Sequence, residues 1–234
     1  MPHGTPIANS REPRFEGAAS EIADRLIYTG YIGDPDRVDG GDETAGADEV
    51  LVSVGGGAVG SALLSTALEA RRRGCLASLT WRLLAGPNLS EQAFGTLAGA
   101  LPEDVVLERY RPEFPKMLRR CRVSVSQAGY NTVLDILTAG ARAVVVPFAS
   151  ERETEQRLRA ERLAACGVLE LLPENQLTAA RLTLAVERAI ERDPRTISVD
   201  LGGARRSARL IANMIRDTES DVPSEILPRD RLAL

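Results

Sequence analysis

Short apolar runs alternate with longer amphipathic stretches from residue 50 to residue 192. Runs such as AVVVPF at 143–148 are apolar without interruption, which is typical of parallel strands covered on both faces. We predict strands at 50–54, 78–84, 105–110, 123–126, 143–148 and 169–172, and helices at 58–73, 90–99, 114–121, 130–139, 153–166 and 178–192. This order predicts an α/β domain with a doubly wound, Rossmann-like parallel sheet.

The segments outside this alternating block differ in composition. Residues 1–24 mix Pro, Gly, Asn, Ser and charges without a period, so we expect a disordered lead-in or the remnant of a preceding domain. A short strand-like run at 26–28 opens the domain, which we place at 25–216, and 34–49 is expected to be an exposed acidic loop within it. A last helix is predicted at 204–216, followed by a disordered tail at 217–234.

Composition narrows the class of partner. With 234 residues, 44% of them apolar, the chain can bury one full core. Its formal charge of −4 is not the polybasic field that drives nucleic-acid binding, so we expect a small-molecule or protein partner. Three widely spaced cysteines, no apolar signal core and no apolar run of about 20 residues favour a reducing cytoplasm without a transmembrane segment. Any contact with a membrane is expected to be peripheral.

A glycine-rich turn follows the first strand of the alternating block. Gly55, Gly57 and Gly60 have the spacing G-x-G-x-x-G between a strand and a helix, where backbone N–H groups can hold phosphate oxygens. A dinucleotide cofactor would also need an acidic residue about 20 residues later, and the strand LTWRLLAG has none. Three interpretations stay open: a nicotinamide or flavin cofactor, glycines that serve the turn alone, and a nucleotide diphosphate beside Gly55, Gly56 and Gly57. We favour the last and predict no cofactor.

A second polar cluster lies where the strand at 123–126 gives way to a helix. It consists of Ser126, Gln127, Ala128, Gly129, Asn131 and Thr132. Ligands of open α/β sheets bind at such carboxyl ends of strands, and Gly129 allows close approach to the backbone. Asp135, one helical turn further on, is placed to reach ribose hydroxyls. The alternative is that Thr132 and Asp135 only cap and solubilise the helix.

Two further groups of polar residues are candidates for ligand contacts. Glu155 and Gln156 begin a helix after the polar loop that follows Phe148, and carboxylate and amide groups suit sugar hydroxyls, although a solvated helix N-terminus has the same composition. Arg109, Arg111 and Lys116 could neutralise a diphosphate, or they are ordinary surface cations. The acidic run at 34–49 is interpreted as a solvated loop, and no metal site is predicted.

The stretch from Cys121 to Leu172, with its SQAGYNT and VPFASERETEQ motifs, resembles the donor-binding domain of inverting GT-B glycosyltransferases of the MurG-like type, glycosyltransferase family 28. The resemblance extends over about residues 25–195. It implies a UDP-sugar donor, with the diphosphate beside the glycine-rich loop and ribose bound at Asp135, where the family carries Glu. It also implies that Glu155 and Gln156 contact the donor sugar, and that backbone around Tyr110 and Arg111 recognises the pyrimidine.

The chain offers no general base for an inverting transfer. Its one histidine, His3, lies in the irregular lead-in, and GT-B enzymes are expected to carry the base and acceptor pocket on an N-terminal domain. We therefore predict no catalytic residue here and expect a hexosyltransferase half that needs an N-terminal acceptor domain or partner chain. The alternative is a non-catalytic module that binds a nucleotide sugar. A sugar-nucleotide epimerase is a more distant third, since it too needs both domains.

Overall fold

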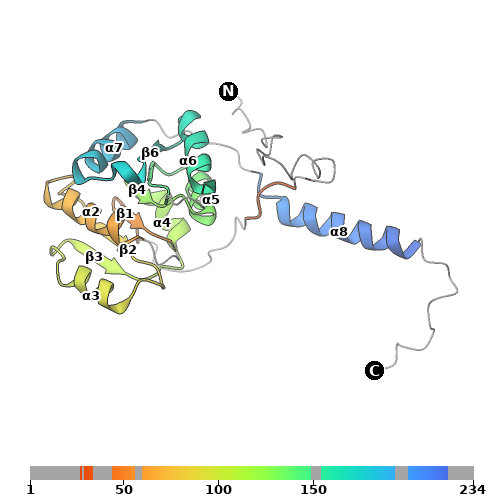
Figure 1. The fold of residues 1–234 in the computed structure, drawn as a ribbon, viewed down its shortest axis with the longest axis horizontal. Helices are drawn as coiled ribbons and strands as arrows, with labels where there is room; N and C mark the ends of the chain where they lie inside the picture. Colours follow the sequence, from red (N-terminus) through yellow and green to blue (C-terminus); the bar gives the residue numbers. More distant parts are fainter. Residues whose placement is uncertain are drawn as a thin grey trace. The chain divides into compact units, whose positions relative to one another are not determined.

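The computed structural model describes residues 27, 29–33, 44–55, 60–148, 154–192 and 200–220 (Figure 1). The chain divides into two compact units. The described part of the larger unit lies within 44–192, and that of the smaller unit consists of the residues near 30 and 200–220. Each unit is described on its own. Gly56, Gly57, the lead-in at 1–24 and most of the predicted acidic loop lie outside the described residues.

The larger unit contains a six-stranded sheet in which every pair of neighbouring strands is parallel. The strand order is β3-β2-β1-β4-β5-β6. The strands are β1 Val50–Ser53, β2 Trp81–Leu84, β3 Val105–Glu108, β4 Val123–Ser126, β5 Ala143–Val145 and β6 Glu170–Leu171. The chain runs outward in one direction from β1 to β3 and in the other from β4 to β6. This confirms the predicted doubly wound, Rossmann-like sheet.

A helix follows each strand of this sheet. The helices are α2 Ser61–Arg72, α3 Glu91–Ala98, α4 Phe114–Arg120, α5 Tyr130–Ala139, α6 Glu155–Ala165 and α7 Ala179–Glu191, with a 3₁₀ turn η2 Glu174–Gln176 before α7. Helix α3 begins at a side-chain cap, Ser90, whose hydroxyl accepts from the N–H of Ala93. Thr178 caps α7 in the same way. The predicted strand at 78–84 begins only at Trp81, because turns occupy 75–79 and Leu76 has a positive φ of 44°.

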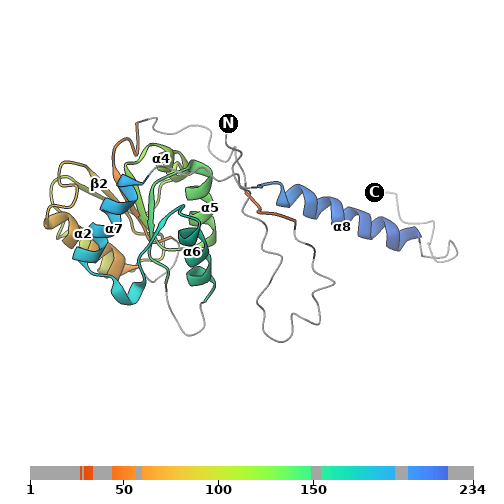
Figure 2. The same cartoon turned by 90° about the horizontal axis from the view of Figure 1, so that it is seen from above.

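The two faces of the sheet differ in polarity. Alternate residues of β1, β2 and β4, including Val52, Trp81 and Val125, pack with α2 and α7 in one buried apolar cluster. Figure 2 shows α2 and α7 on one side of the sheet and α5 and α6 on the other. Burying each such side chain contributes about 1.5–3 kcal/mol, so this face supplies most of the core stability. The opposite face carries Leu51, but also serines and an arginine among its strand residues.

Residues 44–49 lead into β1 and are packed against α4. Ala45 is buried, and the N–H of Asp48 donates to the carbonyl oxygen of Arg120 at 3.3 Å. Gly46 has a φ of +86°, and a Cβ at this position would lie 2.7 Å from Cα of Met117. Only glycine fits such a close approach with this backbone conformation. This end of the predicted acidic loop is therefore a packed turn rather than an exposed linker.

The smaller unit joins residues near 30 to the C-terminal helix α8, Gly203–Ser220. Ile32 and Gly202 form an antiparallel bridge, and Tyr31 exchanges backbone hydrogen bonds of 3.0 Å with Asp200 and Gly203. Arg206 donates to the carbonyl oxygen of Thr29 at 2.6 Å. The helix predicted at 204–216 is confirmed and extends four residues further, to Ser220. No helix in the described ranges is long and apolar enough to cross a lipid bilayer.

Candidate functional site

A cleft of about 290 Å³ opens at the carboxyl ends of the central strands of the sheet. Ser53 of β1 and Leu84 of β2 line it, together with the first turns of α4 and α5. Strands β1 and β4 are neighbours, and the chain leaves them in opposite directions, which makes this the topological switch point of the sheet. Ligands of open α/β sheets bind in the crevice at this point. The cleft is therefore the candidate functional site.

Apolar and polar side chains both line the cleft. The apolar group, called the wall below, consists of Leu84, Pro87, Tyr110, Pro112, Phe114 and Pro115. Prolines and aromatic rings give flat, rigid surfaces of the kind that accommodate a planar ring. Polar side chains also line the cleft, namely Ser53, Arg109, Arg111, Asn131, Thr132 and Asp135. A ligand that combines a planar ring with several oxygen atoms fits this distribution.

Six of the residues predicted from the sequence line this cleft: Gly55, Tyr110, Arg111, Asn131, Thr132 and Asp135. Gly55 has a φ of +65°, so the turn after β1 favours glycine there. Asn131, Thr132 and Asp135 occupy the first six residues of α5, whose N-cap is Gly129. The N-terminal end of a helix carries unpaired N–H groups and a positive dipole end, which favour an anion.

The glycine-rich turn has a second structural role at its described end. A Cβ on Gly60 would lie 2.4 Å from Cβ of Val54, so helix α2 approaches strand β1 too closely for any side chain. This is the helix–strand packing that the third glycine of the G-x-G-x-x-G spacing provides. Since Gly56 and Gly57 are outside the described residues, their predicted place beside a diphosphate stays a prediction.

Three other predicted residues lie next to the cleft without lining it. Ser126 and Ala128 are completely buried, and Gln127 is half-buried, with its N–H donating to the carbonyl oxygen of Ser53 at 3.3 Å. The register of β1 and β4 pairs Ser53 with Ser126. Of this pair, Ser53 lines the cleft and Ser126 does not, and Ser53 was not among the residues predicted from the sequence.

Glu155 and Gln156 lie in the first turn of α6 and also do not line the cleft. The side-chain oxygen of Gln156 accepts from the N–H of Phe148 at 3.3 Å, and Glu155 forms an ion pair with Arg159. Arg159 connects this helix to the turn before α5, because its Nη1 donates to the carbonyl oxygen of Ala128 at 2.9 Å. The predicted sugar contact of Glu155 and Gln156 stays a prediction.

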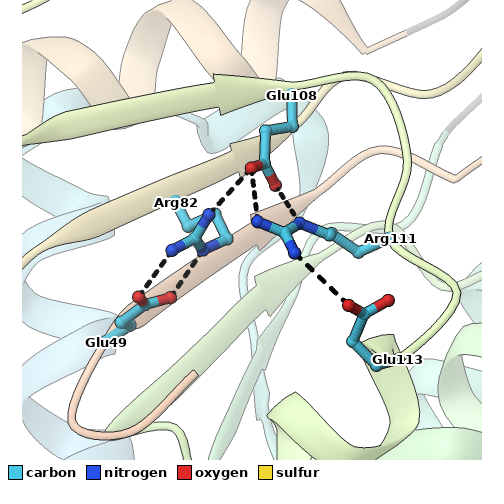
Figure 3. Close-up of polar contacts among 5 residues, drawn as sticks. All are labelled: Glu49, Arg82, Glu108, Arg111 and Glu113. Carbon is cyan, nitrogen blue, oxygen red and sulfur yellow. Dashed lines mark hydrogen bonds and ion pairs between the residues drawn. The ribbon is translucent and has the colours of Figure 1, made fainter. Parts of the chain in front are cut away.

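Arg111 belongs to a chain of five alternating charges that crosses the polar face of the sheet (Figure 3). Arg82 of β2 contacts Glu49 through Nε and Nη2 at 2.7 and 2.8 Å and Glu108 through Nη1 at 3.0 Å. Arg111 in turn contacts Glu108 at 2.7 and 2.8 Å, and Glu113 at 3.3 Å. Every nitrogen of the Arg111 guanidinium group is therefore engaged within the protein.

These contacts shift the pKa values of the charged groups. The hydrogen bonds from Arg111, assisted by the charge of Arg82, lower the pKa of Glu108 against the opposing effect of burial. The bond to Glu108 raises the pKa of Arg111, and the bond to Glu49 raises that of Arg82. All three groups are thus fixed in their charged forms at neutral pH.

Arg109 is also held by protein groups. Its Nη1 donates to the carbonyl oxygen of Leu89 at 2.8 Å, its Nη2 pairs with Glu91 at 2.5 Å, and its guanidinium lies 4.4 Å from the centroid of the Phe94 ring. Arg109 and Arg111 therefore line the cleft as cations whose charges are compensated by carboxylates of the protein. Lys116 does not line the cleft. Within the described ranges, no group of three or more His, Cys, Asp and Glu is arranged to hold a metal ion.

The fold and the cleft at the switch point define the class of protein: a Rossmann-like domain with a candidate ligand cleft at the carboxyl edge of a parallel sheet. The model of the glycosyltransferase family 28 C-terminal domain matches residues 51–213, and the chain belongs to this family.

Similar proteins of known name agree with this membership. One is the UDP-N-acetylglucosamine–N-acetylmuramyl-(pentapeptide) pyrophosphoryl-undecaprenol N-acetylglucosamine transferase of Geobacillus kaustophilus. The chain is 25% identical to it over 205 residues, and the match covers 84% of this chain and 56% of that enzyme. It is 27% identical over 120 residues to the enzyme of the same name from Exiguobacterium sibiricum. That match covers 50% of this chain and 33% of that enzyme. The chain thus spans between about a third and just over half of these two relatives.

Solved structures share the fold. The calicheamicin glycosyltransferase CalG4 superposes with a TM-score of 0.54 at 25% identity, over 79% of this chain and 45% of CalG4. MurG of Acinetobacter baumannii gives a TM-score of 0.51 at 20% identity, over 72% of this chain and 50% of MurG. In both cases the match covers about half of a larger glycosyltransferase, as expected for the C-terminal domain of a GT-B enzyme.

Proposed function

We propose that this chain is the donor-binding half of an inverting glycosyltransferase that transfers a hexosyl group from a UDP-sugar. The observation that carries the proposal is the cleft at the switch point, which is lined by the apolar wall and by Asn131, Thr132 and Asp135 of α5. The wall suits a pyrimidine ring, and the carboxylate of Asp135 suits the ribose hydroxyls. The names of the relatives make UDP-N-acetylglucosamine the first donor to test.

Turnover requires groups that come from elsewhere. Inverting transfer needs a base to deprotonate the acceptor hydroxyl while the nucleotide diphosphate leaves. Among the described cleft residues, Asp135 is the one carboxylate, and we assign it to the ribose. We therefore infer that an N-terminal acceptor domain or a partner chain supplies the base and the acceptor pocket. Since the relatives are named for an undecaprenol-linked substrate, we expect the assembled enzyme to work at a membrane surface.

Calorimetric titration tests donor binding. We expect the purified chain to bind UDP at least tenfold more tightly than ADP, GDP or TDP, since the proline-lined wall suits a small pyrimidine and the ribose contact disfavours the deoxyribose of TDP. Asp135→Asn should weaken UDP about tenfold, the order expected for loss of one hydrogen bond to a charged group. Glu191→Gln, on the opposite face of the sheet, is the matched control and should leave UDP affinity unchanged. Equal affinity of wild type and Asp135→Asn for UDP would show that the Asp135 carboxylate does not contribute to UDP binding.

A transfer assay separates this proposal from a non-catalytic nucleotide-sugar module. We expect no glycosyl transfer by the purified chain with UDP-N-acetylglucosamine and a lipid-linked acceptor. Adding a protein that contains the acceptor-binding half of a relative should restore transfer if the chain is a catalytic half. Tight UDP-sugar binding without transfer in any such combination would favour the module, and transfer by the chain alone would show that the base is present here.

A further inference from the structure

Three serines lie on the polar face of the two central strands. Ser53 ends β1, and Ser124 and Ser126 alternate with the apolar Val123 and Val125 in β4. All three side chains are buried, and none of their hydroxyl groups has a hydrogen-bond partner among the described residues. Burying a hydroxyl without a partner costs stability, so these positions would be more stable with alanine in the absence of a ligand.

One of the three differs from the others in its surroundings. Ser53 is only 6% exposed, yet it lines the cleft, whereas Ser124 and Ser126 are completely enclosed. Ser53 lies across the sheet from Ser126 and two residues before Gly55, at the start of the glycine-rich turn. Its hydroxyl, which has no hydrogen-bond partner among the described residues, therefore belongs to a side chain that lines the cleft close to Gly55.

The chemistry of the cleft indicates what this hydroxyl would bind. Arg109 and Arg111, the two cations that line the cleft, already donate to protein groups. Because the charges of both are compensated, donors from the backbone and from neutral side chains would add to the binding of an anionic oxygen beside the turn after β1. A serine hydroxyl donates one hydrogen bond, and a bond to a charged oxygen is about twice as strong as one between neutral groups.

We propose that Ser53 is a binding residue whose hydroxyl donates a hydrogen bond to a diphosphate oxygen of the donor nucleotide in the cleft. This inference rests on the proposed function, because it takes the ligand to be a nucleotide diphosphate. It explains why a strand of otherwise apolar residues, Val50 to Val52, ends in a buried hydroxyl group. The ligand supplies the partner that the described part of the protein does not.

Paired alanine variants test this role. Ser53→Ala and Ser124→Ala each remove one buried, unpaired hydroxyl from the same sheet face, so both should be as stable to urea as the wild type, or more stable. Calorimetric titration with UDP should then separate them. We expect Ser53→Ala to bind UDP about 10- to 100-fold more weakly, the range for one charge-assisted hydrogen bond, and Ser124→Ala to stay within twofold of wild type.

Two further measurements test whether the Ser53 hydroxyl contacts the diphosphate. Ser53→Thr keeps the hydroxyl group and should retain most of the UDP affinity, which a general packing defect would not allow. Uridine lacks the diphosphate, so its affinity should be the same for wild type and Ser53→Ala. An equal loss for uridine and UDP would overturn the diphosphate assignment.

The result also separates this inference from the function on which it rests. If the wild type binds UDP and Ser53→Ala binds it equally well, only the role of Ser53 is wrong. If the folded wild-type chain binds no nucleotide diphosphate, the proposed donor site and the role of Ser53 are both overturned.

Discussion

Arg159 donates a hydrogen bond from Nη1 to the carbonyl oxygen of Ala128, 2.9 Å away, and its guanidinium lies 5.5 Å from the centroid of the Tyr130 ring. The residue stands on α6, whereas Ala128 and Tyr130 flank the N-cap of α5. One side chain thus fixes the turn that presents Asn131 and Thr132 to the cleft. Arg159 has no contact with the cleft itself and is therefore a positioning residue.

Replacing Arg159 should loosen this turn. We expect Arg159→Gln to lower the free energy of unfolding by about 1.5–3 kcal/mol, the value of a hydrogen bond to a charged group, and to weaken UDP several-fold. Urea unfolding and calorimetry measure the two effects. Arg157→Gln is the control, because its ion pair with Glu161 on the same helix is exposed and should contribute less than about 1 kcal/mol. Equal losses in the two variants would refute the positioning role.

The alternating charges from Glu49 to Glu113 predict that stability depends on pH. Because the pKa of Glu108 is lowered in the folded protein, the stabilisation contributed by its carboxylate is complete above the unfolded pKa of about 4.3. This stabilisation is lost as the pH falls through the lower pKa of the folded state. Glu108→Gln should lower the free energy of unfolding by about 3 kcal/mol at pH 7, because it leaves Arg82 and Arg111 short of a partner.

Urea unfolding of wild type and Glu108→Gln between pH 7 and pH 3 isolates this effect. The difference between the two proteins should be constant down to about pH 5 and shrink below it, as Glu108 of the wild type becomes protonated. A difference that does not change with pH would show that the variant acts through packing rather than charge.

Tyr110 is 63% exposed although it lines the apolar wall of the cleft. If its ring packs against a nucleobase, Tyr110→Ala should weaken UDP by about tenfold, within the range measured for base–aromatic stacking. The stability of the unliganded protein should change little, because the ring is mostly in solvent. Leu184→Ala removes another exposed apolar side chain, on α7, and should leave the affinity unchanged. A loss in both variants would point to a general effect.

The three cysteines should differ in reactivity. Burial raises the pKa of the Cys121 thiol to about 12 and also raises that of Cys75, while Cys166 is exposed at the end of α6. The thiolate is the reactive form, so a disulfide reagent at pH 8 should modify Cys166 rapidly, and both buried Cys75 and partly exposed Cys121 much more slowly until the chain unfolds. Mass spectrometry of the native and the urea-unfolded chain checks this. Rapid double or triple modification of the native protein would contradict the raised pKa values of Cys75 and Cys121.

The fold was largely predictable because each apolar run is short and bounded by clear turn residues. Strand β4 and helix α5 occupy the predicted residues, and most other elements differ only at their ends. The strand predicted at 105–110 stops at Glu108, and Tyr110 and Arg111 belong to the loop that forms the cleft wall. A continuous apolar run identifies a buried strand, but its last residue depends on where the neighbouring strand stops pairing.

The site was predictable only in part, since sequence spacing does not give register. Asn131, Thr132 and Asp135 share one helix end, so their proximity follows from local structure. The partnership of Ser53 with Ser126, and of Arg82 with Glu49 and Glu108, joins residues of different strands and depends on the strand order. The sequence held one signal of these contacts: Arg82 is the single charged residue in the apolar stretch LTWRLLAG, and a charge in a buried strand requires a partner.

Arg82 of β2 and Glu108 of β3 lie on the face of the sheet opposite to Trp81, and this has a consequence for heating. Burial of Trp81 and its apolar neighbours gains little further stabilisation as the temperature rises, whereas the cost of removing water from ions such as Arg82 and Glu49 falls. On warming, ionic contacts should therefore contribute a growing share of the free energy of unfolding relative to apolar packing. The edge formed by β2 and β3 should then depend increasingly on the ionic contacts of Arg82, and the contact of β6 with α7 on the ion pairs that Glu170 forms with Arg188 and Arg192.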